Sequence, residues 1–301
     1  MTPGPDGQRS LSRPVIGFVL GALLLGAAAW VVIRQGKDLQ SAIESARHAP
    51  WWLVAAALVL PLLNWLLMSV SFWVLMRRHG PVGLGEMTSL IGAAWLLNYL
   101  PLRPGLIGRV GYHKTVHGIP VAKSVTATVA AIGCSGVAIV AMVGALVGST
   151  MAGSGALSVG AAAAAPLALA LIAGGALRRT HRFGWVPLIV AFRYLDLLVW
   201  AARYAVAFAI IGRPISAAAA AAIACVCQIA MLVPFFGNGL GLREWAVGVT
   251  ASSLPRDVLT ASGALATTVG LAADLVNRAA EICGAIPVGL ICAARLSARA
   301  R

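Results

Sequence analysis

The sequence predicts an all-α, polytopic membrane protein with about six full helical spans and two opposed re-entrant helical hairpins. Hydrophobic residues make up 60% of the 301 residues, charged residues only 11%, and mean hydropathy is +0.89. Such values lie outside the range of soluble domains. Apolar runs of about 20 residues, long enough to cross a hydrocarbon core of about 30 Å, recur along the chain. Short basic clusters separate these runs, so the net charge of +14 indicates cytoplasmic loops and no nucleic-acid partner.

The chain is expected to form one transmembrane domain. Residues 1–13 are expected to be a disordered cytoplasmic tail, residues 14–295 a single transmembrane domain, and residues 296–301 a second cytoplasmic tail. The first apolar run, residues 15–33, is longer than a typical signal-peptide core, and we interpret it as an uncleaved first span.

Further full spans are expected where the apolar runs reach membrane length, over residues 51–76, 121–147, 157–177, 185–211 and 258–293. Basic clusters follow three of them, at residues 77–79, 178–182 and 295–301. The excess of positive charge in cytoplasmic loops then places both termini in the cytoplasm. The predicted location is the cytoplasmic membrane, which the chain crosses several times.

Two apolar segments are broken by glycine and proline, and each is expected to enter and leave the membrane on the same side. The first runs from about Leu84 through Pro101 to the basic stretch around Lys114. The second spans residues 215–252 and must start and finish outside if the C-terminus is cytoplasmic. Paired interruptions in opposed halves are typical of transporters built from inverted repeats, with a binding site where the halves meet.

Each break combines glycines with arginine, in "NYLPLRPGLIGR" and "PFFGNGLGLREW". Irregular backbone at membrane depth requires a protein-lined or water-filled cavity. Freed backbone N–H groups and guanidinium groups both bind anionic oxygens. The predicted substrate-binding residues are Asn98, Arg103, Gly105, Arg109, Gly237, Asn238, Gly239, Gly241, Arg243 and Glu244. The alternative is that the arginines snorkel to the interface or pair with internal carboxylates, such as Arg243 with Glu244 or a distant acid.

Charged residues inside two predicted spans form a candidate intramembrane charge network. Charge at a helix centre costs about 2.5 to 3.5 kcal/mol on insertion scales, so such residues need partners. Spacing places Asp274, Arg278 and Glu281 on one helical face. In the earlier span, Asp196 and Arg203 share a face, and Arg193 lies one turn before Asp196. A salt-bridge network that fixes packing is favoured for Asp196 and Arg203, whereas structure and function stay open for the later triad.

No cofactor or metal is expected. His113 and His117 are spaced i, i+4, but no third ligand is evident. The "GNGLG" stretch lacks the lysine and hydroxyl residue of a phosphate-binding loop, and the five cysteines match no zinc or disulfide spacing.

At its two motifs the sequence resembles the lysylphosphatidylglycerol synthase transmembrane region, a family also described as flippase-like. The resemblance rests on "NYLPLRPGLIGR" and "PFFGNGLGLRE", and on the order of the spans. Members often carry an acidic residue where this chain has Leu106. The resemblance implies movement of lipids across bacterial membranes, including aminoacylated phosphatidylglycerol, and association with hopanoid or polyprenyl-linked glycan pathways.

The expected function is therefore that of an integral membrane lipid translocase. It would move an anionic or aminoacylated phospholipid, or a polyprenyl- or hopanoid-type lipid, through a central polar cavity. One alternative is a polytopic lipid-modifying transferase with Glu244 or Asp274 as base. Another is a non-transporting partner subunit of a lipid or glycan pathway. The expected partners are the bilayer, a lipid substrate and a lipid-synthesis enzyme, and a homo-oligomer stays open.

Overall fold

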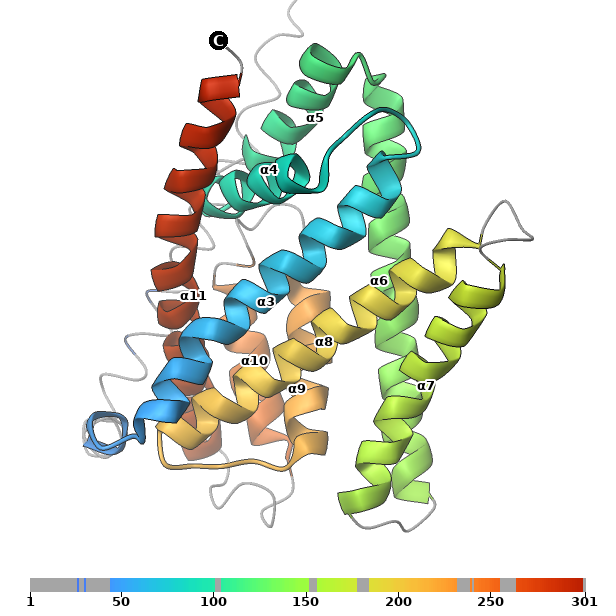
Figure 1. Ribbon diagram of the computed structural model, residues 1–301. Helices are drawn as coiled ribbons and strands as arrows, with labels where there is room; N and C mark the ends of the chain where they lie inside the picture. Colours follow the sequence, from blue (N-terminus) through green and yellow to red (C-terminus); the bar gives the residue numbers. More distant parts are fainter. Residues whose placement is uncertain are drawn as a thin grey trace, which may run out of the picture.

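The structure is a computed structural model of the 301-residue chain, and the residues that it describes are helices and their connections (Figure 1). It describes residues 26, 30, 44–100, 104–151, 156–177, 184–231, 239, 241–254 and 264–299, without the side chains of 156–163, 264, 265 and 299. No strand occurs among them. The helices are α3 (Trp51–Met76), α4 (Leu84–Leu97), α5 (Pro104–His117), α6 (Val121–Met151), α7 (Ala156–Leu177), α8 (Trp185–Ile210), α9 (Ala217–Met231), α10 (Leu242–Ser252) and α11 (Ala264–Arg299).

Four of these helices, α3, α6, α8 and α11, are long and apolar enough to cross a membrane. They confirm the membrane-embedded, all-helical character that the sequence predicts. The expected bounds agree closely for α3 and α8, while α6 continues to Met151 rather than residue 147. The predicted fourth span corresponds to α7. The predicted first span, residues 15–33, and the two tails lie outside the residues that can be described here, apart from single residues at 26 and 30 and the end of α11.

The end of α8 shows how local sequence sets a boundary. Gly212 has a φ of 71°, a left-handed conformation that is favourable for glycine. Its N–H donates to the carbonyl of Ala209, and the N–H of Arg213 donates to the carbonyl of Phe208. These two bonds form a Schellman motif, which satisfies carbonyls that the helix end would otherwise leave unpaired. Pro214 follows and cannot continue the helix.

The same order of helices, with one long helix, two short helices and another long helix, occurs twice. Helix α7 lies between the two sets in the chain. The first set is α3, α4, α5 and α6, and the second is α8, α9, α10 and α11. The helices α3 and α8 pack side by side and run in opposite directions (Figure 1). The α4–α5 pair lies at the end of the molecule that holds the C-terminus, and α9–α10 lies in the other half (Figure 1). Helix α11 contacts both pairs, through α4 and α10.

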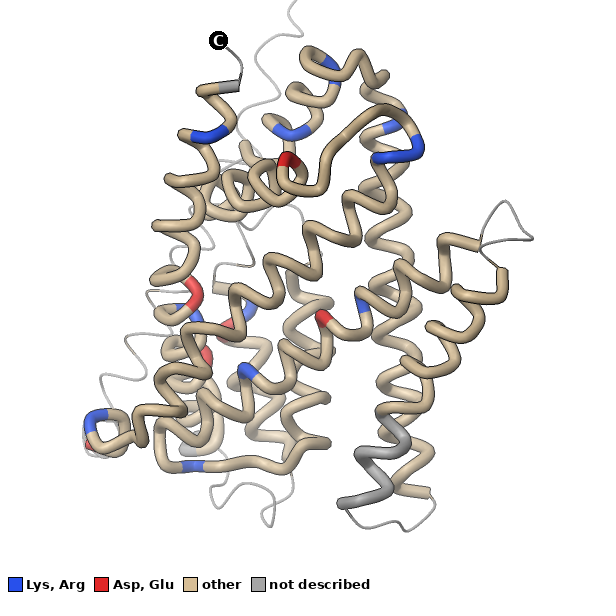
Figure 2. Tube along the Cα trace, viewed as in Figure 1, with Lys and Arg blue, Asp and Glu red and all other residues tan. Residues whose placement is uncertain are grey.

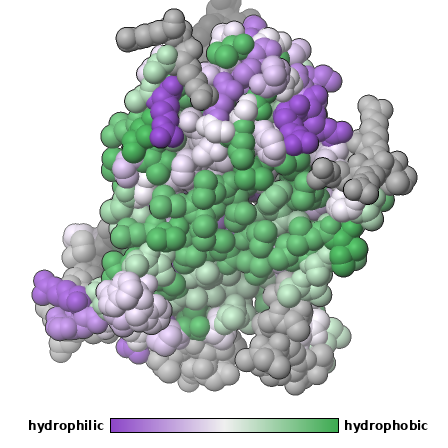
Figure 3. All heavy atoms as spheres, in the orientation of Figure 1, coloured by the Kyte–Doolittle hydropathy of each residue, from purple (hydrophilic) through white to green (hydrophobic). Residues whose placement is uncertain are grey.

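The surface separates by polarity. Figure 3 shows an apolar belt across the middle of one face, with hydrophilic residues gathered toward the C-terminal end and a smaller group at the lower left. Figure 2 shows that Lys and Arg gather at this end, which we call the basic end, whereas acidic residues are mostly deeper in the molecule. Burial, and then the charges of Lys123 and Arg78, lower the pKa of His79 at this end. The belt is the surface expected of a helix bundle that faces hydrocarbon.

Candidate functional site

A cavity of about 290 Å³ lies among α3, α4, α5, α6, α8, α9 and α11. Most of its lining is apolar, and its polar groups are concentrated on a few side chains. The charged lining residues are Arg109, Arg193, Asp196, Arg203 and Glu281. A concave, mainly apolar site with a few convergent polar groups is the usual form of a small-ligand site.

Glu281 of α11 joins two arginines at one side of the cavity. Its Oε2 accepts from Nη2 of Arg203 at 2.7 Å and from Nη1 of Arg243 at 3.0 Å. The Nε of Arg243 also donates to Oδ2 of Asp274 at 3.1 Å. All four side chains are at least 96% buried. Such mutually paired ions are stable at depth only because each charge has its counter-charge and hydrogen bonds within reach.

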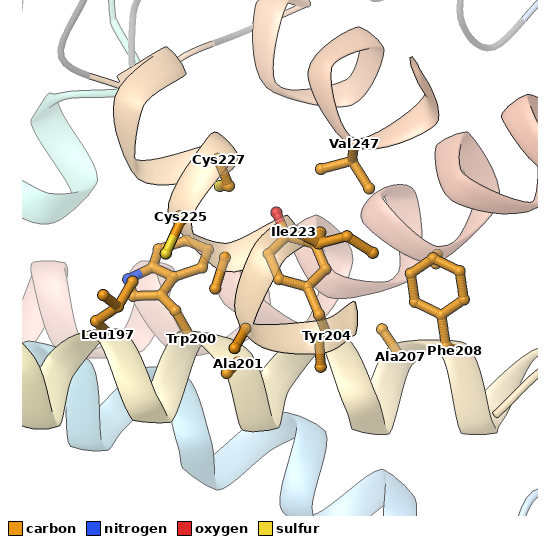
Figure 4. Close-up of a cluster of buried hydrophobic side chains, with 14 of the residues drawn as sticks. Leu197, Trp200, Ala201, Tyr204, Ala207, Phe208, Ile223, Cys225, Cys227 and Val247 are labelled. Carbon is orange, nitrogen blue, oxygen red and sulfur yellow. The ribbon is translucent and has the colours of Figure 1, made fainter. Parts of the chain in front are cut away.

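Arg203 has little capacity left for a ligand. Besides Glu281, its Nε donates to Asn277 at 2.9 Å and its Nη1 donates to Asn64 at 3.1 Å. Its guanidinium carbon lies 3.8 Å from the ring centroid of Trp200, a cation–π distance. Figure 4 shows Trp200 and Tyr204 projecting from α8 in the direction of α9. Arg203 is therefore held on every side by α3, α8 and α11.

Asn64 of α3 connects this group with a further ion pair. Its amide nitrogen donates to Oδ1 of Asp196 at 2.7 Å and to the Asp196 carbonyl at 2.9 Å. The other carboxylate oxygen of Asp196 lies 3.4 Å from Nη1 of Arg193. The predicted salt-bridge network around Asp196 and Arg203 is thus present, but the two residues are linked through Asn64.

Two more contacts complete the buried charge network. Tyr204 donates to Oδ1 of Asp274 at 2.8 Å, and Arg278 forms an ion pair with Glu244. The common face predicted for Asp274, Arg278 and Glu281 is confirmed, since all three are buried and paired with α8 or α10. We define the buried charge network by its charged members, Arg193, Asp196, Arg203, Arg243, Glu244, Asp274, Arg278 and Glu281. Four arginines balance four carboxylates.

Two of the predicted substrate-binding residues belong to this network and do not line the cavity. Arg243 and Glu244 are each 0% exposed. Arg243 pairs with internal carboxylates, as the alternative interpretation expected, but with Asp274 and Glu281 instead of the adjacent Glu244. The same burial leaves Glu244 and Asp274, the candidate bases of the transferase alternative, away from the cavity.

Arg109 of α5 differs from the other buried arginines. It is 8% exposed and lines the cavity, where its Nη2 donates to Oγ1 of Thr128 at 3.0 Å. Its guanidinium carbon lies 3.8 Å from the ring centroid of Phe72. Within the described part of the chain, no carboxylate lies at ion-pair distance from it. Arg109 is therefore a buried cation that faces the cavity and has no carboxylate partner among the described residues.

The neighbouring motif residues have two different roles. Gly105 lies so close to α4 that an added Cβ would clash with the Ala94 backbone and lie 2.7 Å from Oδ1 of Asn98. It allows α4 and α5 to approach closely. Asn98 ends α4 and lines the cavity. Its Oδ1 has no hydrogen-bond partner among the described residues, so it can accept a hydrogen bond from a ligand.

The second motif uses glycine for backbone conformation. Gly239 has a φ of 71°, and Gly241, which immediately precedes α10, has a φ of 78°. L-residues with side chains rarely adopt this conformation. Arg103, Gly237 and Asn238 lie outside the described residues.

His113 and His117, the histidine pair of α5, lie at the basic end. The described residues include no group of three or more His, Cys, Asp or Glu side chains that could hold a metal ion. His117 lies 3.0 Å from Oε1 of Glu86, which also accepts from the Tyr112 hydroxyl at 2.7 Å. This cluster joins α4 to α5. His113 is 1% exposed.

Sequence reasoning missed several neutral members of the site, although it selected Asn98. Asn64, Thr128 and Ser135 hold or contact the charged groups, yet none was selected from the sequence. Asn64 carried a usable signal, because an amide in the middle of an apolar span needs a partner. The hydroxyls carried none, since serine and threonine can satisfy their own protons on helix carbonyls.

Comparisons with known proteins give no family for this chain. No family model, no curated protein and no solved structure matches it. The resemblance of the two motifs to flippase-like proteins therefore stays a prediction, and function is argued from the geometry of the cavity.

Proposed function

We propose that this chain is an integral membrane lipid translocase of the flippase type, which takes an anionic lipid headgroup into the cavity while the acyl chains stay in the bilayer. The single observation that carries the proposal is the position of Arg109 in the cavity wall. It is buried and lines the cavity, and no described carboxylate neutralises it. A charge in such a place is costly without a partner, and a lipid phosphate or carboxylate would supply one.

The groups around Arg109 suit a phosphate. A guanidinium offers planar, bidentate donors that match phosphate oxygens. Stacking on Phe72 and the bond to Thr128 hold the guanidinium in one orientation. The rest of the lining is mainly apolar, so a bound headgroup would meet few competing polar contacts.

An apolar route from the cavity to lipid supports a lipid substrate. Leu106 of α5 and Ile132 of α6 both line the cavity, and they are 38% and 48% exposed. The neighbouring Ile107 and Val129 are 64% and 61% exposed. Acyl chains could remain in contact with these side chains while the headgroup lies inside.

The proposal includes two re-entrant hairpins, α4–α5 and α9–α10, that enter from opposite sides as an inverted repeat. The short helices have 14, 14, 15 and 11 residues, fewer than the about 20 that a full crossing needs. Helix α3 runs toward the basic end and α8 away from it (Figure 1). Positive charge favours the cytoplasmic side, so the basic end faces the cytoplasm of a bacterial inner membrane.

Transport is tested in proteoliposomes with fluorescent phosphatidylglycerol, by quenching the probe in the outer leaflet. Wild type is expected to accelerate flipping, and Arg109→Gln to remove most of that acceleration. The matched control is Lys114→Gln, an exposed cation on the same helix. Flipping that is independent of protein would contradict the proposal. Recovered lipid should be chemically unchanged, whereas a transferase would alter it.

The topology is tested by labelling single cysteines with an impermeant reagent in intact cells. The background replaces Cys283, which is an exposed cysteine, with serine. A cysteine at Lys114 or Lys123 should be protected in intact cells, and one at Arg213 should be labelled. Labelling of the cysteine at position 114 from outside would remove the first re-entrant hairpin from the proposal.

A further inference from the structure

We propose that the cavity holds two anion subsites in series along one face of α6, the first at Arg109 and Thr128 and the second at Arg193 and Ser135. The inference rests on the proposed function, because it assigns the step in which the headgroup moves from the first subsite to the second. All four side chains line the same cavity. Arg193 would then be a transfer residue, in addition to its place in the buried charge network.

The two subsites repeat one arrangement. The Nη2 of Arg109 donates to the Thr128 hydroxyl at 3.0 Å, and the Nε of Arg193 donates to the Ser135 hydroxyl at 2.7 Å. Each hydroxyl donates its own proton to a carbonyl of α6, Thr128 to Ser124 and Ser135 to Ala131, both at 2.9 Å. Each hydroxyl oxygen is therefore committed as an acceptor that orients a guanidinium toward the cavity.

Spacing on α6 sets the distance between the subsites. Thr128 and Ser135 are seven residues apart, which places them on the same face of a helix. At a rise of 1.5 Å per residue this separation is about 10 Å along the axis. Because α6 starts at the basic end (Figure 1), Thr128 is the shallower hydroxyl and Ser135 the deeper one. A headgroup that leaves Arg109 for Arg193 therefore moves toward the middle of the molecule.

The second subsite is only partly neutralised. Nη1 of Arg193 lies 3.4 Å from Asp196, longer than the about 2.7 to 2.9 Å of a strong charge-assisted bond. Its other contact on that nitrogen is the sulfur of Met68, a weak acceptor. Asp196 is at the same time held by Asn64. An arriving phosphate can thus bind Arg193, but less tightly than at Arg109, and sequential sites must be weak enough to release.

The next arginine inward does not extend this series. All three nitrogens of Arg203 already donate, to Asn277, Asn64 and Glu281. Arg243 does not line the cavity. The part of the buried charge network beyond Asp196 is therefore a fixed wall of the cavity. The headgroup moves along this wall after it leaves Arg193.

The experiment separates binding from transfer. Binding is measured with short-chain phosphatidylglycerol added to detergent-purified protein, and transfer with fluorescent phosphatidylglycerol in proteoliposomes. Arg109→Gln should weaken binding by about tenfold or more, as expected for loss of a charged hydrogen-bonding group, and flipping should fall with it. Ser135→Ala, and Arg193→Gln combined with Asp196→Asn to keep the charge balanced, should leave binding within about twofold and slow flipping about tenfold.

Further variants keep the test decisive. Arg193→Lys should restore part of the flipping rate, because it returns the charge without the full fork of donors. Lys114→Gln is the control for surface charge. The second subsite would be overturned if Ser135→Ala and the double variant flipped lipid at the wild-type rate. It would also be overturned if these two variants lost as much binding as Arg109→Gln. Absence of flipping by wild type would overturn the proposed function itself.

Discussion

The two short-helix pairs, α4–α5 and α9–α10, use the same residue type in opposite ways. In each pair the second helix carries a buried arginine near an aromatic ring of the preceding long helix. Arg109 lies 3.8 Å from the Phe72 ring and Arg243 lies 5.6 Å from the Trp200 ring. The long helix that follows makes the difference. Helix α11 supplies two carboxylates to Arg243, whereas α6 supplies only the hydroxyl of Thr128 to Arg109.

This comparison teaches that a motif alone does not define a ligand site. Both arginines follow a glycine- and proline-rich break, yet Arg243 meets two carboxylates and Arg109 meets none among the described residues. The sequence of the following helix distinguishes them, because Val121–Met151 contains no acidic residue and Ala264–Arg299 contains Asp274 and Glu281. The counter-ion, more than the break, decides whether an intramembrane arginine is structural.

The largest expected effect is on Arg243. Arg243→Met should destabilise the fold by about 3–5 kcal/mol, because it leaves Asp274 and Glu281 buried with less compensation. Unfolding in mixed micelles with increasing SDS would measure it. Arg295→Met, an exposed cation on α11, is the control and should change stability little. Adding Asp274→Asn to Arg243→Met should recover part of the loss. A variant as stable as wild type would remove the contrast between the two pairs.

Arg109→Gln should give the opposite pattern. Affinity for short-chain phosphatidylglycerol should fall about 10- to 100-fold, equivalent to the about 1.5–3 kcal/mol of a hydrogen bond to a charged group. Stability should stay the same or rise, because the substitution removes a buried charge that has no carboxylate partner among the described residues. Binding and SDS unfolding of the same preparation test both parts. Destabilisation as large as that of Arg243→Met would show that both arginines stabilise the fold.

Glycine contacts sharpen the comparison within α5. Gly105→Ala should cost about 1–3 kcal/mol, because the new methyl group would overlap the backbone of α4 at Ala94. Gly108→Ala, three residues later, is the matched control. Nothing lies within 4 Å of its added Cβ, so the better helix propensity of alanine should stabilise by up to about 1 kcal/mol. Equal effects of the two substitutions would show that α4 and α5 are not in close contact.

The smallest expected effect is at the start of α10. Gly241→Ala should cost about 1–2 kcal/mol, because its φ of 78° is unfavourable for residues with a Cβ. Gly241→Asn should cost a similar amount, because a ψ of −49° lies outside the left-handed helical region that asparagine tolerates. The same unfolding assay measures both variants. If both are as stable as wild type, the turn before α10 does not need glycine.

Much of this architecture follows from short-range patterns in the sequence. Hydropathy locates α3 and α8 to within a residue, and helical spacing places Asp274, Arg278 and Glu281 on one face. The partners could not be predicted in this way. The bond from Arg203 to Asn64 joins residues 139 apart in sequence, and it depends on how α3 and α8 pack.

The candidate site shows the same limit. Arg109 and Asn98 were both selected from one break, and both line the cavity. Whether each arginine meets a carboxylate depends on helices far away in the chain. For Arg243 the choice between Glu244 and Asp274 is made by the direction in which α10 presents its first turn to α11. No local pattern carries that information.

Helix α11 contains Pro287, which follows the segment that holds the carboxylates. Proline has no N–H, so the carbonyl of Cys283 lacks its usual helical donor, and this turn is a point of reduced bending stiffness. Beyond it, Gly289 approaches the side chain of Leu96. Before it, Trp95 of α4 donates to Oε1 of Glu281 at 3.4 Å. Helix α4 therefore braces α11 on both sides of this turn, and it links the basic end of the molecule directly to the ion pairs.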